Sequence, residues 1–104
     1  MCGIAGVYGL EGITDKQTLA DSLAKSIQHR GPDASNTYID ESVVLVHTRL
    51  SILDLDARSN QPFKDPSGRY VLVFNGEIYN FQEVKTELSA YTFRTESDTE
   101  VVLA

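Results

Sequence analysis

Two short runs of the chain are apolar at consecutive positions, and this pattern restricts the choice of fold. Residues 43–46 read Val-Val-Leu-Val, and residues 70–74 read Tyr-Val-Leu-Val-Phe. Successive side chains of a strand point to opposite faces of its sheet, so these runs place apolar side chains on both faces. We therefore expect two strands that are covered on both sides, which requires several packed layers.

A helix is expected between residues 15 and 28. Leu19, Leu23 and Ile27 recur every four residues and form one apolar stripe. Thr14 and Gln17 have the spacing of a capping box at its start. The pattern thus predicts a helix that packs one face against a neighbouring layer.

The remaining elements follow from apolar runs and turn residues. We expect strands at residues 4–8, 36–40, 43–48, 70–74 and 91–94, a polar loop at 54–68, a helix at 81–89 that starts from Asn80 and Glu83 and buries Val84 and Leu88, and a last helix capped by Ser97 and Glu100. Because that last helix has barely begun at Ala104, and one turn buries too little to hold it, we expect the chain to be truncated.

Composition excludes several classes of protein. The chain has 104 residues, of which 41% are hydrophobic, which fits one ordinary globular domain. Nine Lys and Arg are scattered among fifteen Asp and Glu, so there is no basic face for nucleic acid. The N-terminal run lacks a basic leader and is broken by glycines, unlike a signal peptide or a membrane span. With a single cysteine and so no intrachain disulfide, we expect a cytoplasmic protein with no membrane association.

Cys2 is the most informative residue for chemistry. Aminopeptidases remove Met1 when the next side chain is small, which would leave the cysteine at the chain end. An N-terminal amine near neutral pH can take the proton of a thiol, so nucleophile and base would belong to one residue. The alternative is a small buried thiol without a catalytic role.

Several segments together carry a specific resemblance. They are Cys2-Gly3-Ile4, His29-Arg30-Gly31-Pro32-Asp33, Arg49-Leu50-Ser51-Ile52, Asn75-Gly76-Glu77-Ile78-Tyr79-Asn80 and Ser97-Asp98. In this order the chain resembles the glutaminase half of glutamine-hydrolysing asparagine synthetases, which are class II amidotransferases with an N-terminal nucleophile. The resemblance implies that residues 1–104 are the N-terminal portion of such a domain.

The resemblance also implies roles for individual residues. Cys2 would be the nucleophile, and Arg49 would grip the α-carboxylate of glutamine through paired charge-assisted hydrogen bonds, although a lone Arg is more often part of a surface salt bridge. Asn75 and Gly76 would form the oxyanion hole, whereas Asn-Gly after a strand is also the commonest hairpin turn. Asp98 would receive the α-ammonium group, or would be a plain helix-start aspartate.

Further positions follow with less weight. Substrate contacts are implied for Leu50, Ser51, Ile52, Leu53 and Glu77. Residues 29–33 are interpreted as a shaped turn near the active site. A catalytic Cys-His pair is unnecessary because the α-amine serves as base. The one Cys and two His show no spacing of metal ligands, so we expect no metal.

The fold class implied by the resemblance is α+β, a four-layer αββα sandwich of the N-terminal-nucleophile hydrolases, incomplete at its C-terminus. The implied reaction is hydrolysis of L-glutamine to glutamate and ammonia through a γ-glutamyl thioester on Cys2, without a cofactor. In the full-length ligase, a C-terminal synthetase domain would use the ammonia with ATP and Mg²⁺ to amidate aspartate in amino-acid biosynthesis, and a homodimer is compatible with the family. The Ser-Gly-Gly motif of that domain is absent here. The alternatives are a non-catalytic glutamine-binding or regulatory module, and an inactive fragment.

Overall fold

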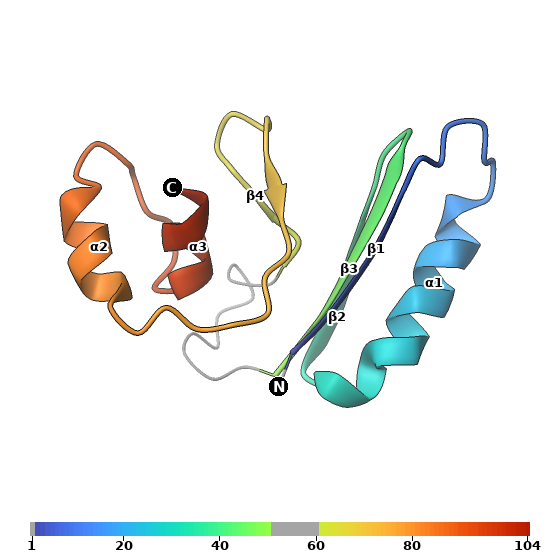
Figure 1. Ribbon diagram of the computed structural model, residues 1–104, viewed down its shortest axis with the longest axis horizontal. Coiled ribbons are helices and arrows are strands. Elements are labelled where there is room, and N and C mark those ends of the chain that lie inside the picture. The colour runs from blue at the N-terminus through green and yellow to red at the C-terminus, as the bar shows by residue number, and fades with distance from the viewer. Residues whose placement is uncertain (1, 51–60) are drawn as a thin grey trace.

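The computed structural model describes residues 2–50 and 61–104 and shows a mixed α/β fold (Figure 1). Its main sheet has three antiparallel strands in the order β1-β3-β2. The strands are β1 (Gly3–Tyr8), β2 (Ala34–Ile39) and β3 (Val43–Arg49). Helix α1 (Lys16–Ile27) covers one side of this sheet. On the other side lies a short hairpin of β4 (Phe63–Lys64) and β5 (Val71–Leu72). The chain then continues into α2 (Phe81–Glu87) and α3 (Asp98–Leu103).

The central position of β3 follows from its antiparallel pairing with both neighbours. Gly3 lies opposite Thr48 in the pair with β1, and Ala34 lies opposite Arg49 in the pair with β2. The turn before β3 is closed by Asp40, whose carboxylate accepts hydrogen bonds from the backbone N–H groups of Ser42 and Val43, both at 2.9 Å. Such local side-chain bonds stabilise tight turns.

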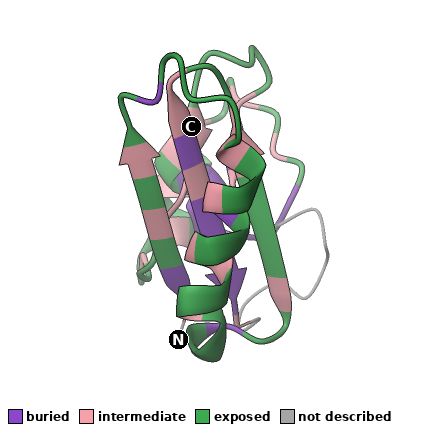
Figure 2. Ribbon diagram, turned by 90° about the vertical axis from the view of Figure 1, so that its right-hand side faces the viewer, coloured by how far each residue is buried: buried purple, intermediate pink, exposed green. Residues whose placement is uncertain are grey.

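The hydrophobic core lies between α1 and the main sheet. Its buried members are Leu10, Ala20, Val44 and Val46. Figure 2 views the molecule from the α1 side, with the buried stretch of the central strand behind the helix. The apolar stripe of α1 packs here, because Leu19, Leu23 and Ile27 contact this core. The prediction of the helix and of its buried face is therefore confirmed.

The opposite face of the main sheet is covered by the second half of the chain. The Lys64 amine of β4 lies over the Tyr38 ring of β2, 5.2 Å from its centroid. Arg94 in turn contacts β4. Its Nη2 atom donates to the Lys64 carbonyl oxygen at 2.7 Å, and its guanidinium lies over the Phe63 ring. The expectation that the strand at residues 43–48 is covered on both sides is confirmed, because Val44 and Val46 are buried on one face and His47 and Arg49 on the other.

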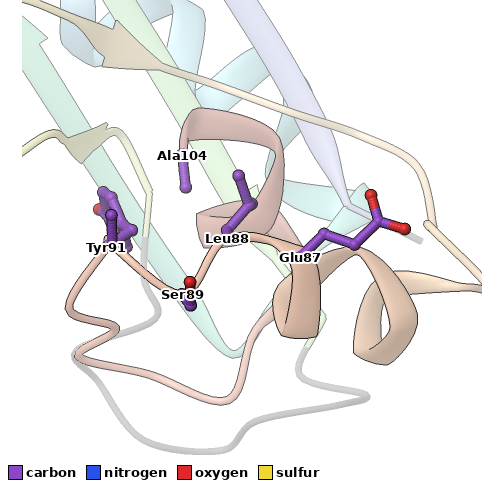
Figure 3. A pocket seen from close by; sticks show the side chains of 6 residues that line it. Glu87, Leu88, Ser89, Tyr91 and Ala104 are labelled. Atoms are coloured by element: carbon purple, nitrogen blue, oxygen red, sulfur yellow. The ribbon is translucent and has the colours of Figure 1, made fainter.

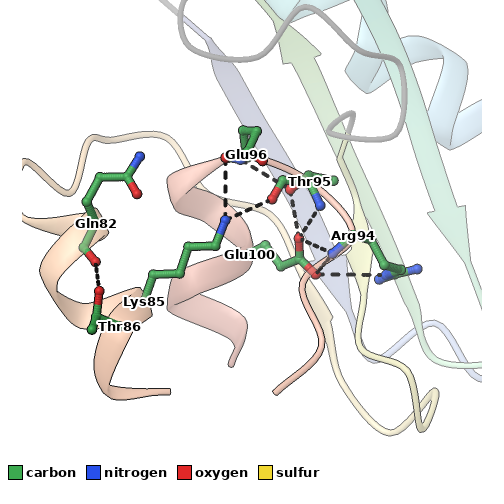
Figure 4. A network of polar contacts seen from close by, with 8 residues as sticks. Gln82, Lys85, Thr86, Arg94, Thr95, Glu96 and Glu100 are labelled. Carbon is green, nitrogen blue, oxygen red and sulfur yellow. Dashed lines mark hydrogen bonds and ion pairs between the residues drawn. The ribbon is translucent and has the colours of Figure 1, made fainter. Parts of the chain in front are cut away.

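The start of α3 is organised by a fully buried carboxylate (Figure 4). Glu100 accepts hydrogen bonds from the backbone N–H groups of Arg94 and Thr95 and from the Thr95 hydroxyl. Ser97 caps the helix and accepts from the Thr99 N–H at 3.1 Å. The expected cap is confirmed, although Glu100 reaches farther back along the chain than a simple capping box.

Three predictions about helices and strands are wrong in detail. Helix α1 is capped by Asp15, whose side chain accepts from the Thr18 N–H, and the capping box expected at Thr14 does not form. Residues 91–94 form no strand, because the Arg94 N–H is bound by the Glu100 carboxylate and not by a neighbouring strand. Helix α2 ends at Glu87, and the two residues expected to be buried, Val84 and the following Leu88, are only half-buried.

The region from 54 to 74 also differs from expectation. Residues 54–60 of the predicted loop lie outside the described residues, and its later part contains β4, which pairs with β5. The predicted strand at 70–74 is reduced to Val71–Leu72. Its backbone is redirected at Phe74, whose N–H and carbonyl both bond to the side chain of Gln61. The Gln61–Pro62 peptide bond is cis.

Candidate active site

The sulfur of Cys2 lies against the backbone of Leu50, just beyond the end of β3. The Leu50 N–H points at Sγ with a distance of 3.4 Å, and Sγ lies 3.7 Å from the Leu50 carbonyl oxygen. Cys2 is half-buried and is a free cysteine. The Leu50 backbone therefore fixes the position of the sulfur at the end of β3.

The turn at residues 28–33 holds Cys2 in place. The Arg30 Nε donates to the Cys2 carbonyl oxygen at 3.2 Å. Gly31 touches β3 so closely that a Cβ would lie 2.4 Å from the Thr48 carbonyl carbon. Only a glycine fits at this distance, and the Asp33 N–H then bonds to the Arg49 carbonyl oxygen at 2.9 Å. These contacts explain the physical role of the His-Arg-Gly-Pro-Asp segment as a shaped turn beside Cys2.

Arg49 lies at the end of β3 on the face that looks toward the second half of the chain. Thr48 faces α1, because its hydroxyl donates to the Ile27 carbonyl oxygen at 3.1 Å, so Arg49 and His47 face the other way. Arg49 is 8% exposed, so it is not an exposed surface salt-bridge partner. A buried guanidinium is suited to pairing with a carboxylate.

His47 is a buried neighbour of Arg49 that sequence reasoning passed over. Burial lowers the pKa of its imidazole, the Phe74 backbone opposes this shift, and the Arg49 charge lowers the pKa further. Neither ring nitrogen has a hydrogen-bond partner of acceptable geometry within residues 2–50 and 61–104, the Phe74 backbone included. Burial and the neighbouring Arg49 charge therefore both favour the neutral imidazole at this position.

Asn75, Gly76 and Glu77 are exposed and lead from β5 toward α2. No strand follows directly, so the Asn-Gly pair does not form the hairpin turn that was the competing interpretation. Gly76 lies close to the Phe74 ring, since a Cβ there would be 2.9 Å from the ring carbon Cζ. The segment is therefore shaped by close packing, with its backbone and side-chain donors accessible from outside.

Asp98 is buried at the first position of α3 and bonds to this same segment. Its Oδ2 accepts from the Ile78 N–H at 2.9 Å. The carboxylate therefore does more than start a helix, because it joins α3 to the segment that carries Asn75 and Gly76. Its second oxygen, Oδ1, is the atom that would remain for an ammonium group.

Gln61 makes a second connection between the same two segments. Its side chain is bonded to the backbone of Phe74, immediately before Asn75, and its Nε2 donates to the Thr99 hydroxyl at 3.1 Å, immediately after Asp98. Gln61 is 5% exposed. No sequence signal indicated it, since a single Gln in a polar segment has no periodicity or motif.

The predicted site residues that the structure describes thus form two groups, each linked by contacts of its own. One group contains Cys2, Arg49 and Leu50 at the end of β3, and the other contains Asn75, Gly76 and Asp98. Ser51, Ile52 and Leu53 lie outside the described residues.

Other features of the described residues add no competing site. An open depression at the ends of α2 and α3 is lined by Glu87, Leu88, Ser89, Ala90, Tyr91 and Ala104, none of which is a predicted site residue (Figure 3). Among residues 2–50 and 61–104, no group of three His, Cys, Asp or Glu side chains could hold a metal ion. None of the helices in these ranges is long and apolar enough to cross a membrane.

The sequence profile of the glutamine amidotransferase domain matches residues 1–104. The chain therefore belongs to the glutamine amidotransferase family of the N-terminal-nucleophile type. Similar proteins include asparagine synthetase [glutamine-hydrolyzing] 1 of Bacillus subtilis, 43% identical over 109 residues that cover 100% of this chain and 17% of the relative. Asparagine synthetase B [glutamine-hydrolyzing] of Escherichia coli is 43% identical over 108 residues, with 100% and 19% covered.

A eukaryotic relative, asparagine synthetase [glutamine-hydrolyzing] 1 of Saccharomyces cerevisiae, is 39% identical over 103 residues, with 99% of this chain and 18% of the relative covered. The resemblance to the N-terminal parts of glutamine-hydrolysing asparagine synthetases is thus confirmed over the whole chain. The chain spans less than a fifth of the length of these relatives.

Proposed function

We propose that this domain hydrolyses L-glutamine to glutamate and ammonia with Cys2 as the nucleophile. The observation that carries the proposal is the position of the Cys2 sulfur, 3.4 Å from the Leu50 N–H and directly beyond the buried Arg49. A nucleophile and a cation for the substrate's α-carboxylate then belong to the same end of the main sheet. Family membership supports the same assignment.

The reaction begins once removal of Met1 frees the α-amine of Cys2. That amine takes the thiol proton, and the thiolate attacks the side-chain amide carbon of glutamine. The negative charge on the amide oxygen is stabilised by the Asn75 side-chain N–H and the Gly76 backbone N–H. The protonated amine then gives its proton to the departing nitrogen, the C–N bond breaks, and ammonia leaves.

The second half of the reaction restores the enzyme. The acyl group is now bound to Cys2 as a γ-glutamyl thioester. A water molecule gives one proton to the free amine as its oxygen attacks the thioester carbon. The C–S bond breaks, the sulfur regains a proton, and glutamate is released. This sequence consumes one glutamine and one water and needs neither a metal nor a nucleotide.

Substrate recognition is assigned to the two ends of the glutamine backbone. Arg49 would bind the α-carboxylate through parallel hydrogen bonds, and Asp98 would receive the α-ammonium group. Leu50, Ser51, Ile52, Leu53 and Glu77 would supply further contacts. The Ile78 N–H that bonds to Oδ2 orients the Asp98 carboxylate and so supports this assignment.

The wider setting is part of the same proposal. Residues 1–104 are taken as the N-terminal portion of a class II amidotransferase domain with a four-layer αββα architecture. In the parent protein, a synthetase domain would use the ammonia with ATP and Mg²⁺ to amidate aspartate in the cytoplasm, and the full-length protein would form a homodimer. The names of the relatives, which are glutamine-hydrolysing asparagine synthetases, support this setting.

The test is ammonia release from glutamine by protein whose loss of Met1 has been verified by mass spectrometry. Wild-type protein should release ammonia, and an acid quench should trap a γ-glutamyl adduct on Cys2. The Cys2→Ser protein, which keeps the amine and the fold, should show neither. Equal rates in the two proteins would remove Cys2 from the reaction, and glutamine binding without ammonia release would indicate a non-catalytic module.

A further inference from the structure

The side chain of Gln61 lies between the two segments that the proposed function assigns to the oxyanion hole and to the α-ammonium site. Its amide bonds to both the N–H and the carbonyl of Phe74, which immediately precedes Asn75. The same Nε2 donates to the Thr99 hydroxyl at 3.1 Å, and Thr99 immediately follows Asp98. The buried Gln61 amide thus bonds to the residue directly before Asn75 and to the residue directly after Asp98.

The direct bond from Ile78 N–H to Asp98 Oδ2 closes this arrangement into a ring. Residues 74–78 and the first turn of α3 are joined at one place by Gln61 and at another by Asp98. Two connections between a pair of segments restrict both their separation and their relative rotation, whereas a single bond would leave them free to pivot. Loss of the Gln61 connection therefore loosens the Asp98 connection as well.

The α3 side of this ring is anchored to the segment that precedes the helix. The first turn of α3 is held by the Glu100 carboxylate, which binds the backbone of Arg94 and Thr95 (Figure 4). Thr99 is only 4% exposed, so its hydroxyl cannot form a hydrogen bond with bulk water in place of the one with Gln61. A buried amide whose bonds are all made within the protein has one favoured geometry, which is what a positioning group requires.

We propose that Gln61 is a positioning residue, which holds Asn75 and Gly76 in a fixed relation to the Asp98 carboxylate across the glutamine site. The inference rests on the proposed function, because it assigns to Gln61 the alignment of groups that act in that reaction. Gln61 does not touch the substrate. It acts through Phe74 on the oxyanion donors and through Thr99 on Asp98.

The two connections of Gln61 predict different kinetic effects. Gln61→Leu removes both, so kcat should fall by about ten- to a hundredfold, since a misplaced oxyanion donor costs up to about that much, and KM should rise. Thr99→Val removes only the hydroxyl and keeps the Phe74 contacts, so KM for glutamine should rise several-fold while kcat changes by less than about twofold. Gln82→Leu and Thr86→Val, two exposed positions on α2, are the matched controls and should leave both constants unchanged.

Amide hydrogen exchange measures the connection without relying on activity. In Gln61→Leu the Phe74 and Ile78 amides should exchange at least about tenfold faster, while the amides of β3 stay protected. In Thr99→Val only the Ile78 amide should exchange faster. If Gln61→Leu also exposes the β3 amides, the milder Thr99→Val protein decides the question.

The outcomes separate this inference from the proposed function. A wild-type protein that releases no ammonia would defeat the proposed function and this inference with it. An active wild type in which Gln61→Leu and Thr99→Val behave like their controls would overturn the inference alone. Amide exchange could be faster in both variants while neither kcat falls in Gln61→Leu nor KM rises in Thr99→Val. That result would show that Gln61 is purely structural, which also overturns the inference.

Discussion

Replacing Glu100 with Gln should destabilise the domain strongly, because this buried carboxylate organises the approach to α3. The side chain is 0% exposed. Oε1 accepts from the Thr95 N–H and hydroxyl, both at 2.8 Å, and Oε2 accepts from the Arg94 N–H at 3.0 Å. Glutamine has nearly the same shape, so the substitution changes the charge and one acceptor without leaving a cavity.

The magnitude follows from these bonds. Hydrogen bonds to a charged group contribute roughly 1.5 to 3 kcal/mol each, and neutral ones about 1 kcal/mol. The two bonds of Thr95 would weaken by about 1 kcal/mol each. The amide NH₂ that replaces Oε2 cannot accept from the Arg94 N–H, which keeps only its 3.1 Å bond to Oε1, and this adds about 1 kcal/mol to the loss. Removal of a buried charge offsets part of this loss. The ion pair with Arg94, at 3.9 Å and half exposed on the Arg side, adds little. We expect a net loss of about 2 to 3 kcal/mol.

Urea denaturation followed by far-UV circular dichroism measures this loss, and the midpoint of thermal unfolding should fall by about 10 to 20 °C. Glu96→Gln is the matched control, because Glu96 has a 79% exposed side chain, pairs with Lys85 at 3.5 Å and should change stability by less than about 0.5 kcal/mol. A Glu100→Gln protein that unfolds within about 0.5 kcal/mol of wild type would refute the reasoning.

Three further predictions concern the main sheet and its helix. Gly31→Ala should cost about 2 kcal/mol or more in urea denaturation, because its Cβ would overlap the β3 backbone at 2.4 Å, and a change below about 0.5 kcal/mol would contradict this contact. Asp15→Ala should speed amide exchange in the first turn of α1 and Asp15→Asn should do so less; an Asn protein as fast as the Ala protein would argue against the cap bond. The lowered pKa of His47 means that the unfolded chain binds a proton more readily, so stability should be complete above about pH 6.5 and should fall below it by at most about 1.4 kcal/mol per pH unit. His47→Gln should remove this slope between pH 6.5 and 5, whereas His29→Gln, a change at an exposed histidine, should keep it. The same slope in the wild type and both variants would refute the assignment of this pH dependence to His47.

Elements whose stability depends on local pattern were predicted well. The apolar stripe at Leu19, Leu23 and Ile27 fixed both the existence of α1 and the face that it buries. Apolar runs and flanking turn residues also located β1, β2 and β3 to within a few residues. Ser97 was correctly expected as a cap, since a serine before an amphipathic turn satisfies free N–H groups regardless of the rest of the fold.

Elements that depend on distant partners were predicted poorly. The segment at 91–94 has strand-like residues, yet its backbone is bound by Glu100. The strand at 70–74 is cut short because Gln61 bonds to the backbone of Phe74 in place of a neighbouring strand. In both cases a buried polar side chain competes for backbone groups, and no local pattern reveals which side chain will arrive there.

The proposed chemistry rests on the sequence and its resemblance, because a cysteine directly after Met1, an arginine after an apolar strand and an Asn-Gly pair each have the functional group that the proposed step needs. Their arrangement depends on contacts between residues far apart in the chain: the Leu50 N–H at the Cys2 sulfur, the Ile78 N–H at Asp98, and the Gln61 amide between Phe74 and Thr99. The reason is physical. Functional groups belong to single residues, whereas the distances and the exclusion of water that make them useful arise only when the layers of the fold pack together.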